Sequence, residues 1–117
     1  MNQRVLSSRF PYLPLLLSVR DRSEQIEALL DTGFDGDIAV PRGFISDREP
    51  PDFHIPCTLA DGSEVLVPAY LGEIHLGALG RFPIAIAALG DEPLVGRGVT
   101  DRFTVILDHG QQLIVEP

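Results

Sequence analysis

Short apolar segments, each ended by glycine, proline or acidic residues, follow one another along the whole chain. Segments of this kind with partial alternation are typical of β-strands, and turn signals at regular spacing between them indicate an all-β sandwich or barrel. The strands that this pattern predicts cover residues 15–20, 25–30, 38–40, 54–60, 64–76, 82–89, 104–107 and 112–115.

The segments between these strands carry turn chemistry. Asp61-Gly62 is a strong hairpin signal, and Asp108-His109-Gly110 predicts a second tight turn near the end of the chain. One helical turn is expected in the proline-containing loop 43–53, and another at 99–103. The long strand is expected to bend near Pro68 or Gly72. Residues 1–8 are expected to form a loose or edge segment.

Composition narrows the class of protein. A chain of 117 residues is long enough for one domain, 1–117, with one core. The net charge of −8 argues against a nucleic-acid partner, since phosphate binding needs basic patches. Cys57 is the single cysteine, which excludes an internal disulfide and fits the reducing cytoplasm. Apolar runs are too short for a membrane span, so no membrane partner is expected.

The most informative stretch is Leu29-Leu30-Asp31-Thr32-Gly33, where an apolar run ends in an acid, a hydroxyl and a glycine. Leu29 and Leu30 are expected to lie inside. Thr32 offers a hydroxyl that can hold the loop to a backbone carbonyl, and Gly33 allows another chain to approach closely. Together these residues describe a carboxylate on a rigid, exposed turn.

This stretch resembles the active-site loop of the retropepsin-like aspartic proteases, and its continuation Phe34-Asp35-Gly36 resembles bacterial single-domain members. A later segment, Leu94-Val95-Gly96-Arg97, matches the second motif of that family. The resemblance covers nearly the whole chain. It implies a single-lobed, closed β-barrel of the acid-protease type, with a flap hairpin at 58–65 and one short C-terminal helix.

The resemblance also implies an activity. Aspartic protease catalysis needs two carboxyl groups that share one proton. Since the chain has one Asp-Thr-Gly motif, a working site needs a homodimer in which each copy contributes Asp31. The expected activity is that of an endopeptidase on a peptide or protein substrate, without cofactor or metal. The catalytic residues that it implies are Asp31, Thr32 and Gly33, and the substrate-binding residues are Phe34, Asp35, Ala60, Asp61, Gly62, Ser63 and Leu94.

Further expectations rest on the same resemblance. Gly96 and Arg97 would support the site, and Arg97 would form an ion pair with Asp35. Phe34 replaces a usually small residue and would narrow the pocket. The dimer interface would include the Asp31 loop and terminal strands such as residues 113–115.

Other interpretations of these residues have less support. Asp31, Asp35 and Asp37 resemble part of a calcium loop, but Arg42 stands where the bidentate glutamate would be needed. Gly96-Arg97-Gly98 is half of a dinucleotide fingerprint whose third glycine is missing. His54 and Cys57 are spaced like half of a metal site. The main functional alternative is a catalytically silent peptide-binding or dimerisation module of the same fold.

Overall fold

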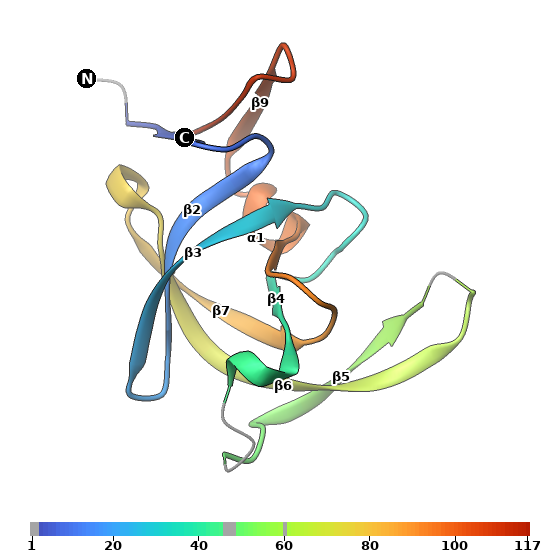
Figure 1. Cartoon of the computed structure of the whole chain (residues 1–117). Coiled ribbons are helices and arrows are strands. Elements are labelled where there is room, and N and C mark those ends of the chain that lie inside the picture. Colours follow the sequence, from blue (N-terminus) through green and yellow to red (C-terminus); the bar gives the residue numbers. More distant parts are fainter. Residues whose placement is uncertain (1–2, 46–48, 60) are drawn as a thin grey trace.

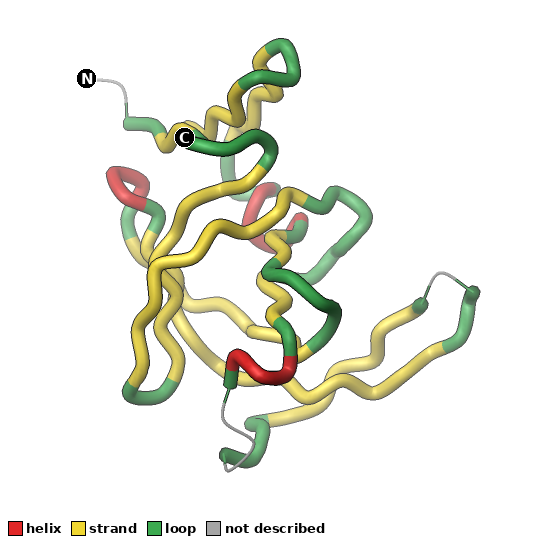
Figure 2. The backbone as a smooth tube through the Cα atoms, viewed as in Figure 1, coloured by secondary structure: helices red, strands yellow, loops and turns green. Residues whose placement is uncertain are grey.

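The computed structural model describes residues 3–45, 49–59 and 61–117, and these residues form an open arm attached to a closed barrel (Figure 1). Strands dominate the chain, and the helical segments are three short turns (Figure 2). The strands are β1 (Val5–Leu6), β2 (Tyr12–Val19), β3 (Arg22–Leu30), β4 (Ile38–Val40), β5 (Phe53–Thr58), β6 (Glu64–His75), β7 (Arg81–Ala88), β8 (Leu94–Val95), β9 (Thr104–Asp108) and β10 (Gln112–Glu116). The helical turns are η1 (Arg42–Phe44), η2 (Gly77–Leu79) and α1 (Arg97–Thr100).

The alternating pattern of β2 explains how the barrel begins. Leu13, Leu15, Leu17 and Val19 are buried, while the residues between them are half-buried. A strand with this period of two directs every second side chain into the core. It pairs with β3 in an antiparallel hairpin that runs from Val19↔Arg22 to Tyr12↔Leu29. The hairpin predicted to deliver Asp31 is therefore present.

Six strands close into a barrel. The seven-stranded sheet has the order β2-β3-β8-β4-β7-β6-β5, and an additional pairing of β2 with β6 closes the ring and leaves β5 outside it. Gly72 lies at this closure, opposite Val19. A Cβ at position 72 would lie 2.6 Å from the Ser18 carbonyl oxygen, so glycine is what allows the two strands to approach. The predicted all-β barrel is confirmed.

A separate three-stranded sheet joins the two ends of the chain, in the order β1-β10-β9. Residues 113–115 lie in its central strand, and their side chains are buried. The backbone of β10 is paired on both sides, so it has no free edge for a second copy. The expectation that the dimer interface includes residues 113–115 stays a prediction, and it cannot involve new backbone pairing of β10, because strands of the same chain already occupy both of its edges.

The core is divided into a large and a small cluster. The large one fills the barrel with aliphatic side chains from β2, β4, β6, β7 and β10. The small one is built on Ala39, Val67 and Ala87, and it lies where the arm leaves the barrel. Its partly buried members are Phe34, Ile55, Cys57, Leu89 and Leu94. These side chains come from four different segments, and they connect the Asp31 loop with the arm.

The arm is the hairpin of β5 and β6. Its register runs from Phe53↔Ala69 to Thr58↔Glu64, and it extends well beyond the barrel (Figure 1). The hairpin predicted at 58–65 is present, and its turn follows Thr58. The loop before it carries the one helical turn expected from the sequence, η1. The helical turn expected at 99–103 begins two residues earlier, as α1.

Candidate active site

Asp31 lies at the end of β3, where the strand leaves the barrel. Its N–H donates to the Val95 carbonyl oxygen at 3.0 Å, which continues the parallel pairing of β3 with β8. Its Oδ1 accepts the Gly33 N–H at 2.9 Å, and its carbonyl oxygen accepts the Phe34 N–H at 3.2 Å. These bonds fold residues 31–34 into a tight turn that fixes the direction of the carboxyl group.

The surroundings of Asp31 are less buried than the sequence predicts. Leu29, Leu30 and Asp31 are all half-buried, while Thr32 and Gly33 are exposed. Within the described part of the chain, the Thr32 hydroxyl has no hydrogen-bond partner, so the expected bond to a nearby carbonyl is not formed. The tip of the loop, Thr32 and Gly33, is thus exposed to solvent in the single chain.

Backbone hydrogen bonds join the Asp31 loop to the second motif. Gly96 N–H donates to Asp37 O at 2.9 Å, Arg97 N–H to Phe34 O at 2.8 Å, and Gly98 N–H to Gly36 O at 3.0 Å. The donors are the last residue before α1 and its first two residues, whose N–H groups have no partner inside a helix. Two segments that are distant in sequence therefore form one unit.

The packing of this unit requires glycine. A Cβ on Gly96 would lie 2.3 Å from the Gly36 carbonyl oxygen and 2.6 Å from that of Phe34. The Phe34 ring also lies close to Gly36, where an added Cβ would be 2.5 Å from the ring. The aromatic side chain is half-buried and fills the space that both glycines leave open.

The predicted ion pair between Asp35 and Arg97 is wrong. Arg97 Nη2 lies 3.3 Å from Asp101 Oδ2, one turn further along the helix, and Asp35 is exposed. The carboxylate that does brace the loop is that of Asp37. Its Oδ2 accepts the Ala85 N–H at 2.9 Å, and Oδ1 lies so close to Gly98 that a Cβ there would be only 2.0 Å away. Asp37 thereby links the loop to β7.

A hollow of about 430 Å³ lies between the Asp31 loop and the arm. Gly33, Phe34 and Asp35 line one side of it, and β5 lines the other. Arg97 and Leu89 complete the wall. The lining of this hollow combines apolar and polar surface in similar amounts, and a concave site with both kinds of surface can hold part of a peptide. Of the predicted substrate-binding residues, Phe34 and Asp35 line this hollow, and Leu94 belongs to the apolar cluster that contains Phe34.

Sequence reasoning missed the wall of the hollow that β5 provides. Ile55, Pro56, Cys57 and Thr58 line it, and none was proposed as a site residue. The half-buried residues of β5 are Phe53, Ile55 and Cys57, every second position, and this alternation was the available signal. Burial, together with the nearby Asp35 carboxylate, raises the pKa of the Cys57 thiol, so this cysteine is a poor nucleophile.

The tip of the arm is held by its own turn. Gly62 has φ +87°, a left-handed conformation that favours glycine. Asp61 Oδ1 accepts hydrogen bonds from the Ser63 hydroxyl at 2.5 Å and from the Ser63 N–H at 2.9 Å. These bonds hold the pKa of the Asp61 carboxyl below its usual range. Ala60, also predicted to bind substrate, lies outside the described residues.

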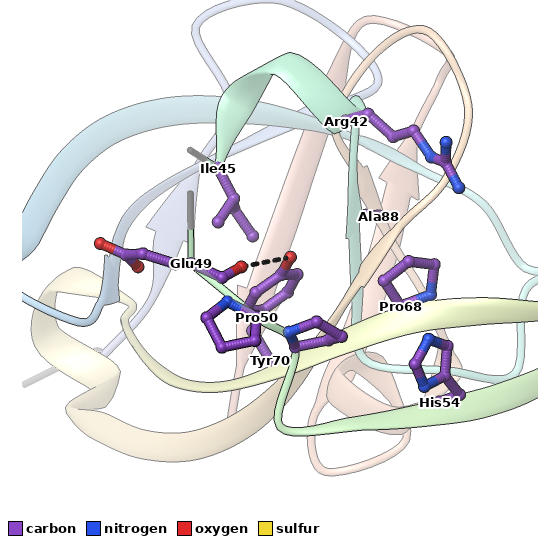
Figure 3. A pocket seen from close by; sticks show the side chains of 9 residues that line it. Arg42, Ile45, Glu49, Pro50, His54, Pro68, Tyr70 and Ala88 are labelled. Carbon is purple, nitrogen blue, oxygen red and sulfur yellow. Dashed lines mark hydrogen bonds between the residues drawn. The ribbon is translucent and has the colours of Figure 1, made fainter. Parts of the chain in front are cut away.

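A second hollow, of about 310 Å³, lies beside η1 and β6, and no predicted site residue lines it (Figure 3). Its walls include Arg42, His54 and Tyr70, and the Tyr70 hydroxyl donates to the Glu49 carbonyl oxygen at 3.4 Å. Among the described residues, no group of three or more His, Cys, Asp or Glu side chains gathers to hold a metal ion. His54 and Cys57 are three positions apart in β5, and since side chains alternate between the two faces of a strand, they lie on opposite faces.

This combination of a closed barrel, an acid at the end of one strand and a long hairpin beside it defines a retropepsin-like fold. A solved structure with the same fold is the crystal structure of a retropepsin-like aspartic protease from Rickettsia conorii. The similarity covers 96% of this chain and 87% of that chain, with a TM-score of 0.60 and 17% sequence identity. No protein-family model matches the sequence, and no curated protein matches it.

Helices in the described ranges are all too short to cross a membrane.

Proposed function

We propose that the chain is an aspartic endopeptidase that acts as a homodimer. The observation that carries the proposal is the loop that begins with Asp31: the second motif holds this loop in place, and its residues 33–36 line a hollow that a peptide could enter. The fold is that of a retropepsin-like aspartic protease, and aspartic protease catalysis needs two carboxyl groups that share one proton. A single lobe with one Asp-Thr-Gly motif has half of the required pair, so a second copy completes the site.

The chemistry of the pair follows from charge repulsion. Two carboxyl groups about 3 Å apart cannot both ionise, so the two Asp31 side chains share one proton. The ionised carboxyl takes a proton from a water molecule, whose oxygen attacks the carbonyl carbon of the peptide bond. The protonated carboxyl donates its proton to the carbonyl oxygen. Return of a proton to the peptide nitrogen then allows the C–N bond to break.

Two features of the single chain support this dimer. The half-buried Asp31 is followed by the exposed Thr32 and Gly33, so the tip of the loop is free to meet its symmetry mate. The unpartnered Thr32 hydroxyl would find its hydrogen-bond partner across the two-fold axis. The arm, with Asp61, Gly62 and Ser63 at its tip, would act as the flap that covers the bound peptide and excludes water. We place the protein in the cytoplasm because its single cysteine fits a reducing compartment.

Asp31→Asn tests the proposal. The amide cannot act as a base, but its oxygen can still accept the Gly33 N–H, so the fold should remain intact. We expect cleavage of a peptide library, followed by mass spectrometry, to fall by at least a thousandfold. Asp91→Asn, in an exposed loop, is the matched control and should keep full activity.

Dilution provides a second readout, because each active site needs two copies. Specific activity should decrease when the protein is diluted to concentrations below the dimer dissociation constant, and it should recover at higher protein concentration. Cleavage that persists at full rate in Asp31→Asn would refute the dyad. Peptide binding without cleavage by the wild-type dimer would instead assign the silent binding module.

A further inference from the structure

One edge of β6 changes its partner strand where the arm joins the barrel. Up to Ala69 this edge is paired with β5, and from Gly72 onward it is paired with β2. Leu71 lies in the gap between these two partner strands. The side chain of Asp52 fills the gap, since Oδ2 accepts the Leu71 N–H at 2.8 Å, while the Asp52 N–H donates to the Ala69 carbonyl oxygen at 3.0 Å. Asp52 therefore closes the base of the arm onto the barrel.

Arg20 is the residue that holds the segment around Asp52. It follows the end of β2 directly. Its Nη1 donates to Asp52 Oδ1 at 3.1 Å, and its Nη2 donates to the Pro50 carbonyl oxygen at 2.9 Å. Its Nε lies 3.3 Å from Glu49 Oε2. A planar guanidinium group can satisfy several acceptors at once, so one side chain fixes three points of the segment 49–52.

The backbone of Arg20 adopts a conformation that favours glycine. Its φ is +57°, in the left-handed region that residues other than glycine enter infrequently. Glycine, asparagine or aspartate is the usual choice for such a turn position, so arginine is unfavourable for the turn itself. Its side chain instead contacts residues that are 30 and 32 positions further along the chain. The value of arginine at this position therefore lies in what it holds at the base of the arm.

The surroundings of the Arg20 side chain make these contacts effective. The Arg20 side chain is 32% exposed and that of Asp52 is 26% exposed, whereas the side chains of the Arg97–Asp101 pair are 55% and 62% exposed. Ion pairs that are open to solvent contribute little, and those in a partly shielded network contribute more. The guanidinium group also lies over the Tyr70 ring, 5.6 Å from its centroid, and Tyr70 is buried in the barrel core. The segment is thus attached to a rigid support.

The segment 49–52 leads directly into β5, which begins at Phe53 and lines one side of the hollow beside the Asp31 loop. The other side is the Asp31 loop itself, which the second motif holds. The separation of the two walls therefore depends on how the base of the arm is attached to the barrel. We infer that Arg20 is a positioning residue for the β5 wall of this hollow. The inference rests on the proposed function only where peptide turnover is measured.

Cys57 reports the position of β5 without any need for catalysis. It is the single cysteine of the chain, it lines the hollow, and it is partly buried in the small apolar cluster. Arg20→Gly removes the side chain and suits the left-handed backbone, so the turn should be retained. The rate at which Ellman's reagent labels Cys57 should rise at least about fivefold in this variant. Hydrogen exchange of the Leu71 amide should also accelerate, because its acceptor Asp52 is no longer fixed.

Two variants separate this role from general effects of losing an arginine. Arg81→Ala also removes an arginine paired with an acid, since Arg81 Nη1 lies 3.8 Å from Glu73 Oε1, but at the other end of β6. It should leave both readouts at their wild-type values. Arg20→Lys keeps the charge without the planar fork, and it should label at an intermediate rate. The inference is overturned if Arg20→Gly or Arg20→Lys labels at the wild-type rate, or if Arg81→Ala accelerates labelling as much as Arg20→Gly does.

Peptide turnover links the positioning role to the proposed function. With a peptide that the wild type cleaves, Arg20→Gly should raise KM at least about fivefold and change kcat less than about twofold, because it disturbs the wall that binds the peptide and leaves the Asp31 loop in place. A lower kcat with unchanged KM would contradict a positioning role in binding. If the wild type cleaves no peptide, the proposed function fails, while the labelling of Cys57 and the exchange of Leu71 still decide whether Arg20 positions β5.

Discussion

Gly96→Ala, which adds a single methyl group, should strongly disrupt the packing of the Asp31 loop against the start of α1. The φ of −104° and ψ of −175° at Gly96 are extended backbone that alanine also adopts, so Gly96→Ala introduces no backbone strain. The added Cβ would instead lie 2.3 Å from Gly36 O and 2.6 Å from Phe34 O. Both obstacles are backbone atoms, which cannot rotate away as a flexible side chain would. The Asp31 loop and the start of α1 must therefore separate.

The expected cost combines two terms. Overpacking of a tight site costs about 1–3 kcal/mol. Separation would also weaken the hydrogen bonds from Gly96, Arg97 and Gly98 to the Asp31 loop, and each such bond contributes about 0.5–1.5 kcal/mol. Since the structure can relax by losing some of these bonds rather than all, we expect a loss of about 2–5 kcal/mol.

Urea unfolding followed by far-ultraviolet circular dichroism measures this loss, because the chain has no tryptophan to report by fluorescence. Gly43→Ala is the matched control, since a Cβ there has no atom within 4 Å, and it should change stability by no more than about 0.5 kcal/mol. Hydrogen exchange of the Phe34 and Gly98 amides should accelerate in Gly96→Ala and should be unchanged in Gly43→Ala. Equal stability of the two variants would refute the steric account of the second motif.

Two further predictions concern pH and the arm. Asp52 accepts hydrogen bonds from Leu71 N–H and, with a smaller effect, from Arg20, and these hold the pKa of its carboxyl below the ordinary value. The ionised Asp52 carboxylate should stabilise the fold fully at pH 7, and this stabilisation should decline as the pH falls below about 4 and through the lowered pKa of the native state. The difference in the free energy of unfolding between wild type and Asp52→Asn should therefore be larger at pH 7 than at pH 2. An equal difference at the two pH values would contradict the prediction. Gly62→Val places a branched side chain at φ +87° and should cost about 1–3 kcal/mol, whereas Gly43→Val has no such strain. If urea unfolding shows equal losses for these two valine variants, the strain assigned to the turn is absent.

Local signals in the sequence were sufficient to predict most strands. The apolar segment at residues 15–20 predicted most of β2, which begins three residues earlier, and the turn dipeptide Asp61-Gly62 predicted the hairpin of the arm. The hairpin at Asp108-His109-Gly110 is present as well, with positive φ at His109 and Gly110. In each case the deciding interaction lies within a few residues, and sequence patterns report such interactions directly.

Contacts between distant segments could not be predicted in the same way. Arg97 has two acidic candidates, Asp35 and Asp101, and the one a single helical turn away forms the pair. Asp37 was considered only as a calcium ligand, yet its partner is the Ala85 N–H, which no side-chain pattern reveals. The central position of β10 depends on β1, a strand too short to be recognised by its periodicity.

The length of β6 has a mechanical consequence. From Ala69 to His75 this strand is paired inside the barrel with β7, and near its end also with β2, whereas Glu64 to Pro68 is paired with β5 alone. The base of the arm is therefore held by the barrel strands, whereas its outer part can bend. Backbone pairing with β7 ends at Ala69, but Val67 is still buried in the small cluster, so bending is expected beyond Val67, toward the tip of the arm. The tip at Gly62 can then travel furthest while the barrel strands keep their pairing.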